Sequence, residues 1–476
     1  MPCRVLKDRG ERDKNLSRLM TTALSGHEKA LPRASLENYL QSTLRKREIL
    51  EESALRFGTP QYFFDEPGLA IQVTRFCDTF SKVIPKCRAF YAMKSNCFEG
   101  ICRYVLKAGM GLDVSSGFEL SRALAMDCDE ILFSGPGKTD EELLLACQHP
   151  GEVTLLMDSG GELQRLSTIT KMHEQGVGPL RVGIRVRTNS HGMWDKFGIP
   201  LKDLEGLMKE ATRVVGIEFK GIQFHTSWNL DPRAQINMVN SIGDHIRDRV
   251  SRTLWPCLQF LDIGGGFWPE QGEWLNPENT LKGKVLKLLD SNHRFRRKHY
   301  FFGAKPLEDF ATQIASAFSS QGPPLSLMEV WMEPGRWIAN PAMHILLTVV
   351  DKKDARTVIT DGGTNLLGWE RPLTEFIPVI NLTRPSLEER GMKIFGSLCT
   401  PHDMWGTSLF GTGIEPGDVL LIPDQGAYTY SLRQSFIKPK GRVVRYDGQV
   451  LEEVEKEEVL SSPMQSGDSW TFPCVL

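Results

Sequence analysis

One lysine in the segment FYAMKSNCFEG, residues 90–100, stands between an apolar run and a polar turn. At the end of an apolar strand, most lysines are surface residues whose stem packs on carbon while the ammonium reaches water. A partly desolvated amine, in contrast, loses part of its preference for the charged form and can form a Schiff base with an aldehyde. If Lys94 does this chemistry, the chain must also provide a phosphate site for the aldehyde compound.

Two further motifs carry groups that can bind an anion. The run LDIGGGF places Gly264, Gly265 and Gly266 after a strand-like segment, where backbone N–H groups can approach an anion closely because no side chain intervenes. The same run fits an ordinary tight turn, and it lacks the G-x-G-x-x-G spacing of a dinucleotide site. In MEPGR, Glu333 can pair with a heterocyclic nitrogen and Arg336 can grip a phosphate or carboxylate, although a turn with a surface ion pair would read the same.

The composition is that of a globular protein. Of the 476 residues, 41% are hydrophobic and 24% are charged, and 57 basic residues against 59 acidic ones give a net charge of -2. The chain has no broad basic stretch and no apolar run of about 20 residues, so we expect neither nucleic acid nor a membrane as a partner. Ten cysteines stand singly, without the spacing of a zinc site or a disulfide scaffold, and the charged start lacks a secretory signal. We therefore expect a cytoplasmic protein without a bound metal.

The elements that must position these residues repeat along the chain. From about residue 60 to 330, short apolar runs alternate with amphipathic ones in about eight units, the count of a closed (β/α)8 barrel. Polar residues cluster at the carboxyl ends of these runs, where barrel enzymes hold their active sites. After about residue 335, turn-rich alternating segments predict a mostly β domain. We predict a helical extension (1–55), a barrel (56–335) and a C-terminal β domain (336–476).

Nine motifs, in order and in approximate spacing, resemble one known family. They are YAMKSN, GLDVSSGFEL, RVRTNS with KFGIP, GIQFH, DIGGGF, EPGR, DGGTN, GSLCTPHD and PGDVLLIPDQGAYTYSL, and they cover roughly residues 60–440. The chain thereby resembles the fold-type III pyridoxal-phosphate decarboxylases, the family of diaminopimelate, ornithine and arginine decarboxylases, whose barrel relative is alanine racemase. This resemblance implies an alanine racemase-like barrel, pyridoxal 5′-phosphate as cofactor and α-decarboxylation of a small-molecule amino acid.

The resemblance also implies roles for individual residues. Lys94 matches the lysine that holds the cofactor, and Glu333 matches the glutamate that faces the pyridine nitrogen and makes the ring a better electron sink. His225 matches a histidine stacked on the ring, whereas a lone histidine at a strand end is more often structural. The cofactor-binding residues that the resemblance implies are Lys94, Asp113, Arg185, His225, Ser227, Gly264, Gly265, Gly266, Glu333, Gly335, Arg336 and Tyr428.

Parts of this set have alternative interpretations. Asp113 and Arg185 match a charged pair near the cofactor, but they also fit an ion pair inside the barrel. Relatives read His-x-Gly-Ser after the histidine strand, whereas this chain reads HTSWN. Ser227 is displaced by one residue and Trp228 occupies the usual serine position, so the chain departs from the family at this phosphate contact.

Cys399 resembles the cysteine that returns a proton to the α-carbon after decarboxylation. A cysteine in the middle of a chain is ordinarily a small buried apolar residue, but GSLCTPHD is polar and begins with glycine. In relatives this loop comes from the neighbouring subunit and completes its partner's active site. The implied assembly is a homodimer with two shared sites.

The residues around the far end of the substrate differ from those of diamine-type relatives. Such relatives have an acidic residue after the cysteine, where this chain has Thr400, and a missing carboxylate would cost a buried ammonium about a few kcal/mol. Arg371 lies near where diaminopimelate enzymes present a carboxylate-binding arginine, or it forms a surface pair with Glu370. The substrate contacts we expect are Arg336, Arg371, Thr400, His402, Asp403 and Tyr428.

This pattern hints at a substrate whose far end is acylated or carboxylated. The candidates are diaminopimelate, a citryl-diamino acid of siderophore assembly and a glutamyl group bound to an acyl carrier. Two alternatives to a decarboxylase remain. A racemase of the same fold typically pairs the ring nitrogen with an arginine, where this chain has Glu333. An inactive decarboxylase-like protein that binds the cofactor or regulates a partner tends to lose the lysine or the cysteine, and both are present here.

Overall fold

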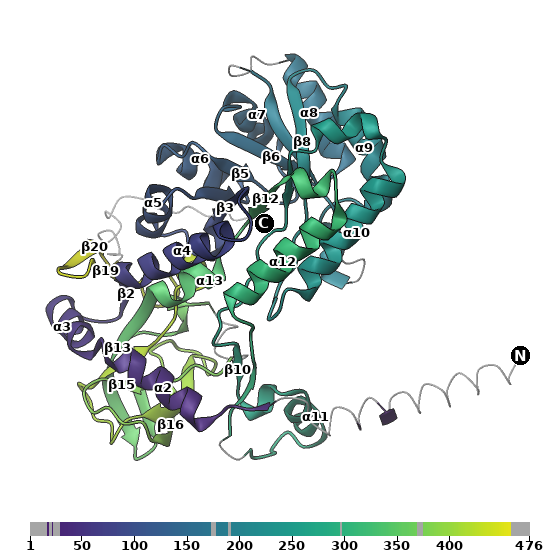
Figure 1. Ribbon diagram of the computed structural model, residues 1–476. Helices are drawn as coiled ribbons and strands as arrows, with labels where there is room; N and C mark the ends of the chain where they lie inside the picture. Colours follow the sequence, from purple (N-terminus) through teal and green to yellow (C-terminus); the bar gives the residue numbers. More distant parts are fainter. Residues whose placement is uncertain are drawn as a thin grey trace, which may run out of the picture.

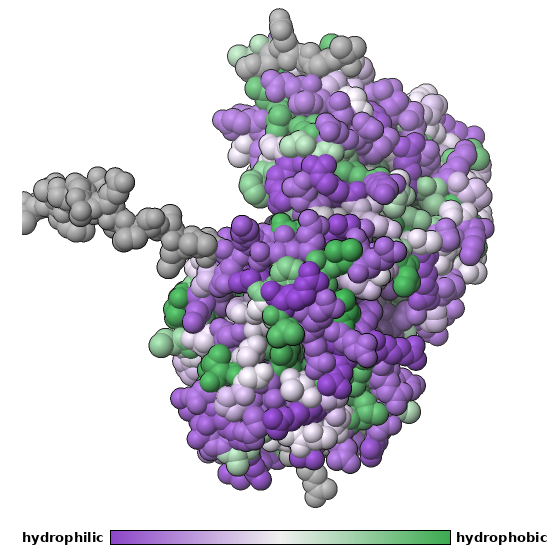
Figure 2. All heavy atoms as spheres, turned by 90° about the vertical axis from the view of Figure 1, so that its left-hand side faces the viewer, coloured by the Kyte–Doolittle hydropathy of each residue, from purple (hydrophilic) through white to green (hydrophobic). Residues whose placement is uncertain are grey.

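The computed structural model describes residues 17, 18, 21, 29–172, 178–188, 192–295, 298–368 and 375–457. Arg371, a predicted substrate contact, lies outside these described residues. In Figure 1, a barrel surrounded by helices forms the upper part of the molecule and a β domain forms the lower left part. Hydrophilic side chains predominate on the face shown in Figure 2, with hydrophobic ones in small groups between them.

Eight parallel strands close into the barrel that the sequence predicts, in the order β12, β3, β4, β5, β6, β7, β8, β9. Most residues of these strands are buried, as expected for strands packed inside the barrel and against helices outside it. Their bounds are β3 (Cys87–Ala92), β4 (Gly111–Val114), β5 (Ile131–Phe133), β6 (Val153–Met157), β7 (Leu180–Arg185), β8 (Ile217–Gln223), β9 (Phe260–Asp262) and β12 (Glu329–Met332).

Helices connect these strands and cover the outside of the barrel. Their starts follow the capping rules: Thr139 and Glu142 form a capping box at one helix, and the Ser116 side chain accepts from the backbone of Glu119 at another. The inside is filled by a separate apolar cluster, in which Phe260 and Trp331 stack with ring centroids 3.7 Å apart. The helices are α4 (Glu66–Ser81), α5 (Glu99–Lys107), α6 (Gly117–Ala125), α7 (Asp140–Gln148), α8 (Gly160–Met172), α9 (Leu204–Ala211), α10 (Arg233–Arg249) and α12 (Leu307–Gln321).

A nine-stranded sheet forms the second domain, in the order β14, β16, β17, β15, β18, β13, β2, β19, β20. One member corrects the predicted boundary at residue 56, because β2 (Gln61–Asp65) pairs with β13 and β19 and not with the barrel. The short helix α13 (Arg336–Ala339) leads from the barrel into this domain. The other strands are β13 (Met343–Asp354), β14 (Thr357–Thr360), β15 (Ile380–Asn381), β16 (Glu389–Phe395), β17 (Met404–Phe410), β18 (Val419–Ile422), β19 (Arg442–Tyr446) and β20 (Leu451–Glu455).

The described part of the N-terminal extension contains the helices α2 (Arg33–Leu44) and α3 (Arg47–Phe57), where the sequence predicts a loose start and then a helix. Their buried residues join the apolar cluster of the β domain. The extension also meets an insertion between β9 and α12. There β1 (Lys29–Ala30), β11 (Tyr300–Phe302) and β10 (Glu273–Leu275) form a small antiparallel sheet, beside helix α11 (Leu281–Leu289).

In the parts of the chain that the structure describes, no helix combines the length and the apolar character needed to cross a bilayer.

Candidate active site

Lys94 lies in a single 3-10 turn (Met93–Ser95) directly after β3, at the carboxyl end of the barrel. Its Nζ lies 2.5 Å from Oδ2 of Asp113, the third residue of the neighbouring strand β4. Burial alone would lower the pKa of Lys94, but the negative charges of Asp113 and Glu333 raise it above its ordinary value. In this state the amine is therefore a cation held by a buried carboxylate, and 34% of its side chain remains exposed.

Glu333 follows β12 and is almost completely buried. Its Oε1 accepts a hydrogen bond from Gln223 Nε2 at 2.9 Å, and its Oε2 lies 3.3 Å from His225 Nδ1. Burial alone would raise the pKa of Glu333, but the hydrogen bond from His225 and the charges of Lys94, His225 and Arg185 lower it to about 2. The barrel therefore holds a carboxylate anion at its carboxyl end.

Asp262, at the end of β9, is a second buried acid that the sequence analysis missed. Its Oδ1 accepts from the backbone N–H of Gly264 at 2.8 Å. Burial and the negative charge of Glu333 raise the pKa of Asp262 well above its ordinary value. The surroundings therefore favour the neutral form of Asp262 next to the Glu333 carboxylate. An acid at the end of an apolar strand, next to the glycine run, was the signal that could have found it.

The glycine run packs tightly under Glu333 and His225. Gly264 and Gly266 have φ of +66° and +76°, and a Cβ on Gly265 would lie 2.2 Å from the carbonyl oxygen of Glu333. The Gly264 N–H donates to Asp262, and the Gly265 N–H donates to His225 Nδ1 at 3.2 Å. When His225 Nδ1 carries a proton, it donates to Glu333 and cannot accept from the Gly265 N–H. The two hydrogen bonds of Nδ1 therefore exclude each other. Of the three glycines predicted to contact an anion, Gly266 lines the cavity between the barrel and the β domain, and Gly264 and Gly265 do not.

A cavity of about 300 Å³, here called the central cavity, opens between the barrel and the β domain. Its volume lies at the lower end of the range usual for small-molecule sites. The lining combines an amine, an anion, an imidazole, a guanidinium and a phenol in one space. The residues are Ala92, Lys94, His225, Ser227, Trp228, Gly266, Phe267, Trp268, Glu333, Gly335, Arg336 and Tyr428.

Arg336 is held between two aromatic rings at this cavity. Its guanidinium carbon lies 4.5 Å from the ring centre of Trp268 and 5.0 Å from that of Tyr428. The Tyr428 N–H donates to the carbonyl oxygen of Ser95 at 2.7 Å, which ties the β domain to the turn that carries Lys94. Gly335 is required beside them, because a Cβ there would lie 2.9 Å from the Cβ of Ser95. The sequence analysis named Arg336, Gly335 and Tyr428 but missed Trp268.

Two predicted residues, Asp113 and Arg185, act on the central cavity from behind its lining. Asp113 contacts Lys94, as described, and also accepts a hydrogen bond from Ser134 Oγ. Arg185 lies 3.9 Å from an Asp158 oxygen, and its guanidinium carbon lies 4.4 Å from the ring centre of Phe197. Asp113 and Arg185 therefore have separate partners. These partners explain the burial of both residues without an ion pair between them and without a direct cofactor contact.

The loop between β16 and β17 lies apart from the central cavity of its own chain. Cys399, Thr400 and His402 are exposed or half-buried there, and none of them lines the cavity. Asp403, predicted as a substrate contact, is buried instead, and its oxygens accept from the N–H groups of Thr364 and Leu398, both at 2.7 Å. The structure corrects this prediction: the donors that fill the Asp403 carboxylate give it the role of anchoring the loop.

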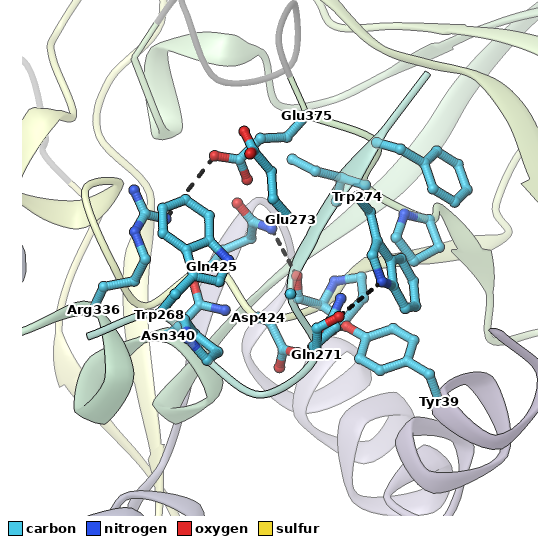
Figure 3. Close-up of a pocket in the computed structure, with 16 residues that line it drawn as sticks. Tyr39, Trp268, Gln271, Glu273, Trp274, Arg336, Asn340, Glu375, Asp424 and Gln425 are labelled. Carbon is cyan, nitrogen blue, oxygen red and sulfur yellow. Dashed lines mark hydrogen bonds and ion pairs between the residues drawn. The ribbon is translucent and has the colours of Figure 1, made fainter. Parts of the chain in front are cut away.

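A second, smaller pocket lies beside the central cavity and shares Trp268 and Arg336 with it (Figure 3). This side pocket has a volume of about 40 Å³. Its other walls come from the N-terminal helix α2, from the insertion at β10 and from two segments of the β domain. Its lining residues besides the shared pair include Tyr39, Glu273, Trp274, Glu375, Asp424 and Gln425.

The barrel, the buried anion beside an amine and the cationic end of the cavity together define a class, the pyridoxal-dependent decarboxylases. The chain belongs to this family. The family model described as "Pyridoxal-dependent decarboxylase, pyridoxal binding domain" matches residues 71–340, which include the whole barrel. The chain is therefore a pyridoxal phosphate-dependent amino-acid decarboxylase, as the motifs predict.

The similar proteins include bacterial and archaeal decarboxylases. The chain is 28% identical over 403 residues to diaminopimelate decarboxylase of Methanothermobacter thermautotrophicus, covering 81% of this chain and 86% of that protein. It is 25% identical to 2-[(L-alanin-3-ylcarbamoyl)methyl]-2-hydroxybutanedioate decarboxylase of Staphylococcus aureus, covering 78% of this chain and 89% of that protein. The crystal structure of Helicobacter pylori diaminopimelate decarboxylase with L-lysine superposes with a TM-score of 0.69 at 23% identity, over 86% of this chain and 97% of that chain. This last likeness concerns the fold.

The residues present fit pyridoxal phosphate. The cofactor needs an amine, an anion for its ring nitrogen and a cationic end for its phosphate. The central cavity offers Lys94, ionised Glu333 and Arg336 for these three needs. Glycine is required at position 266 of this wall, because a Cβ there would lie 2.1 Å from the carbonyl oxygen of Thr226.

Proposed function

We propose that this enzyme removes the α-carboxyl group of a diamino acid, or of an acylated or carboxylated derivative of one, at the central cavity. The observation that carries the proposal is that an amine and an ionised, buried carboxylate, Lys94 and Glu333, line the same cavity. Two relatives act on diaminopimelate and on a citryl-type derivative of a diamino acid, which supports this substrate class.

Individual residues of the chain would hold the cofactor. Lys94 binds it through its amine, Glu333 meets the ring nitrogen, and His225 lies against the ring. Arg336, Gly266 and Tyr428 receive the phosphate. When bound, pyridoxal phosphate supplies an electron sink for the pair left behind by the departing CO₂.

The surrounding residues keep the charges in place. Asp113 orients the Lys94 amine, since the two groups lie 2.5 Å apart. Glu333 is favoured as an anion because Gln223 donates to it and because Lys94, His225 and Arg185 place positive charge near it. Trp268 and Tyr428 hold Arg336 from both faces, which fixes the direction of its N–H groups.

The proton that replaces the lost carboxyl group comes from Cys399 of a second copy of the chain in this proposal. The support is geometric, because the exposed Cys399 does not line the central cavity of its own chain. A two-fold homodimer with two shared sites follows. A cytoplasmic location is part of the same proposal, and the eight cysteines of the described residues, none in a disulfide, support a reducing compartment.

The test is to purify the protein with its cofactor and to incubate it with lysine, ornithine, diaminopimelate, glutamate and their N-acyl derivatives. At least one of them should release CO₂ and give a product lighter by one carboxyl group. A bound-cofactor absorbance band at about 420 nm, absent in Lys94→Ala, would place the cofactor on this lysine. If the wild-type protein holds the cofactor but only inverts the α-carbon of these compounds, decarboxylation is the wrong activity.

A further inference from the structure

The side pocket adjoins the central cavity at Arg336, which the sequence predicts as a contact for both the cofactor and the substrate. It shares Trp268 and Arg336 with the central cavity, so a group longer than the α-amino acid core can pass from one space to the other (Figure 3). Part of its wall comes from segments outside the nine family motifs, namely α2 and the insertion at β10, whereas Arg336, Asp424 and Gln425 lie within motifs. The inference drawn from this pocket rests on the proposed function, because it concerns which substrate that activity takes.

Carboxylates outnumber cations among the residues that line the side pocket. Of the residues that line it, all within the described part of the chain, three are carboxylates and one is a cation, Arg336. Arg336 Nη1 lies 4.0 Å from Glu375 Oε1, at the edge of an ion pair. Asp424 accepts a hydrogen bond from the hydroxyl of Tyr39 at 2.9 Å. Glu273 faces Glu375, and burial together with this neighbouring negative charge raises the pKa of Glu273. A positive charge placed here would therefore be stabilised.

A buried acceptor points to the same kind of ligand. Gln425 is 1% exposed, and its Nε2 donates to the carbonyl oxygen of Pro423 at 2.7 Å, which fixes the orientation of the amide. Its Oε1 has no hydrogen-bond partner among the described residues. Figure 3 shows the Gln425 side chain close to Arg336 and Glu273. Since a buried acceptor without a donor is costly, a ligand that donates N–H groups would complete this wall.

We propose that the side pocket binds the protonated primary amine at the far end of the substrate, with Glu273, Glu375 and Gln425 Oε1 as its acceptors. The size agrees with this assignment. One water needs about 10–15 Å³ of such space, so a pocket of about 40 Å³ holds an ammonium group and excludes a citryl group or a carrier arm. Glu273 and Glu375 thus supply the carboxylate that Thr400 does not, and the substrate is a free diamino acid.

The decisive variant is Glu273→Gln, which keeps the shape of the side chain and removes its charge. With a free diamino acid as substrate, its KM should rise about 10- to 100-fold, as expected for loss of a charged hydrogen bond, while kcat changes less than about threefold. The matched control is Glu278→Gln, which removes the same charge from the same insertion but does not line the pocket. Its KM should equal that of the wild type. Glu375→Gln, on another segment, is the second variant and should raise KM as Glu273→Gln does.

Binding of a diamine tests the pocket without turnover. Cadaverine, titrated calorimetrically into the cofactor-loaded protein, should bind the wild type and the Glu278→Gln control equally, and bind Glu273→Gln about 10-fold or more weakly. The inference is overturned if folded Glu273→Gln and Glu375→Gln match the wild type in both KM and cadaverine affinity. It is also overturned if Nε-acetyl-lysine or another N-acyl derivative is decarboxylated better than its free amine. If no compound loses CO₂, the proposed function fails, whereas the cadaverine titration still decides whether the pocket binds an amine.

Discussion

Glu333 and Asp262 are two buried acids whose pKa values are shifted in opposite directions, so replacing each by its amide should have unequal effects. The surroundings lower the pKa of Glu333 from 4.5 to about 2. A shift of this size favours the anion by about 3 kcal/mol, since each pKa unit corresponds to about 1.4 kcal/mol. Glu333→Gln removes that anion from the ring nitrogen of the cofactor. If this free energy supports the reaction, kcat falls by about 100-fold.

Asp262→Asn should be nearly silent by comparison. The surroundings favour the neutral form of this acid, and an amide in its place can still accept from the Gly264 N–H. We expect kcat to stay within about fivefold of the wild type. The contrasting variant is Asp262→Leu, which has the wrong shape and no donor, and which should lose both cofactor affinity and activity. The measurements are CO₂ release and retention of cofactor on gel filtration. If Asp262→Asn lost as much activity as Glu333→Gln, the neutral form of Asp262 could not be the functional one, because Asp262 would then be needed as an anion.

The same pair makes a prediction for stability against pH. The folded-state pKa of Glu333 is lowered, so its contribution to stability is present above about pH 4.5 and is lost as the pH falls towards about 2. The folded-state pKa of Asp262 is raised, so its contribution is present below the ordinary value of 3.8 and is lost as the pH rises above it. Asp262→Asn removes that second loss. Its melting temperature relative to the wild type should therefore increase between pH 4 and pH 7, and a constant or falling difference would show that Asp262 ionises freely.

Three further outcomes are expected. Lys94→Ala should lose the cofactor absorbance and at least about 1,000-fold in activity, and turnover at the wild-type rate would remove Lys94 from the site. Cys399→Ala should slow product formation by about 100-fold, and because the proposed sites are shared, mixing it with Lys94→Ala should restore about a quarter of the wild-type activity through mixed dimers. No recovery on mixing would mean that each chain supplies its own cysteine. Lys138→Met should lower the free energy of unfolding by about 3–5 kcal/mol, because it strands the buried Glu162 carboxylate 2.8 Å from the lost ammonium. In urea denaturation, Glu162→Met in the same chain should recover most of that loss, whereas an additive double variant would contradict the pairing.

The barrel could be predicted from the sequence because its signal is local and repeated. Each unit contains a short buried strand and an amphipathic helix, and parallel strands joined in this way close on one another. The strand β2 carries the same apolar pattern but pairs in the other sheet, where Tyr62 lies opposite Ile345 and Val443. These partners are far away in the sequence, and nothing in the five letters of the strand tells which sheet receives it. The boundary at residue 56 therefore could not be placed from the pattern alone.

The active site could also be predicted only in part from the sequence. Residues at the carboxyl ends of barrel strands must meet at one rim, so the positions of Lys94, His225 and Glu333 followed from the barrel itself. Hydrogen-bond partners did not follow from it. The N–H groups of Gly264 and Gly265 donate within the chain, and Asp403 anchors its own loop, because each of these polar groups found a partner through packing that the sequence does not display. Asp262 was missed for the same reason, since its neutral state depends on a charge at Glu333.

The division between motif and non-motif segments has a physical consequence for specificity. Groups that handle the α-carbon and the cofactor must keep fixed distances, so they lie on the rigid rim of the barrel. In the proposed amine site, the far end of the substrate instead meets Glu273 from the insertion, which the small sheet of β1, β11 and β10 joins to the N-terminal extension. Such segments can change in charge and shape without moving Lys94 or Glu333. Substrate choice in this enzyme can therefore vary independently of its chemistry, with Arg336 as the residue that the two spaces share.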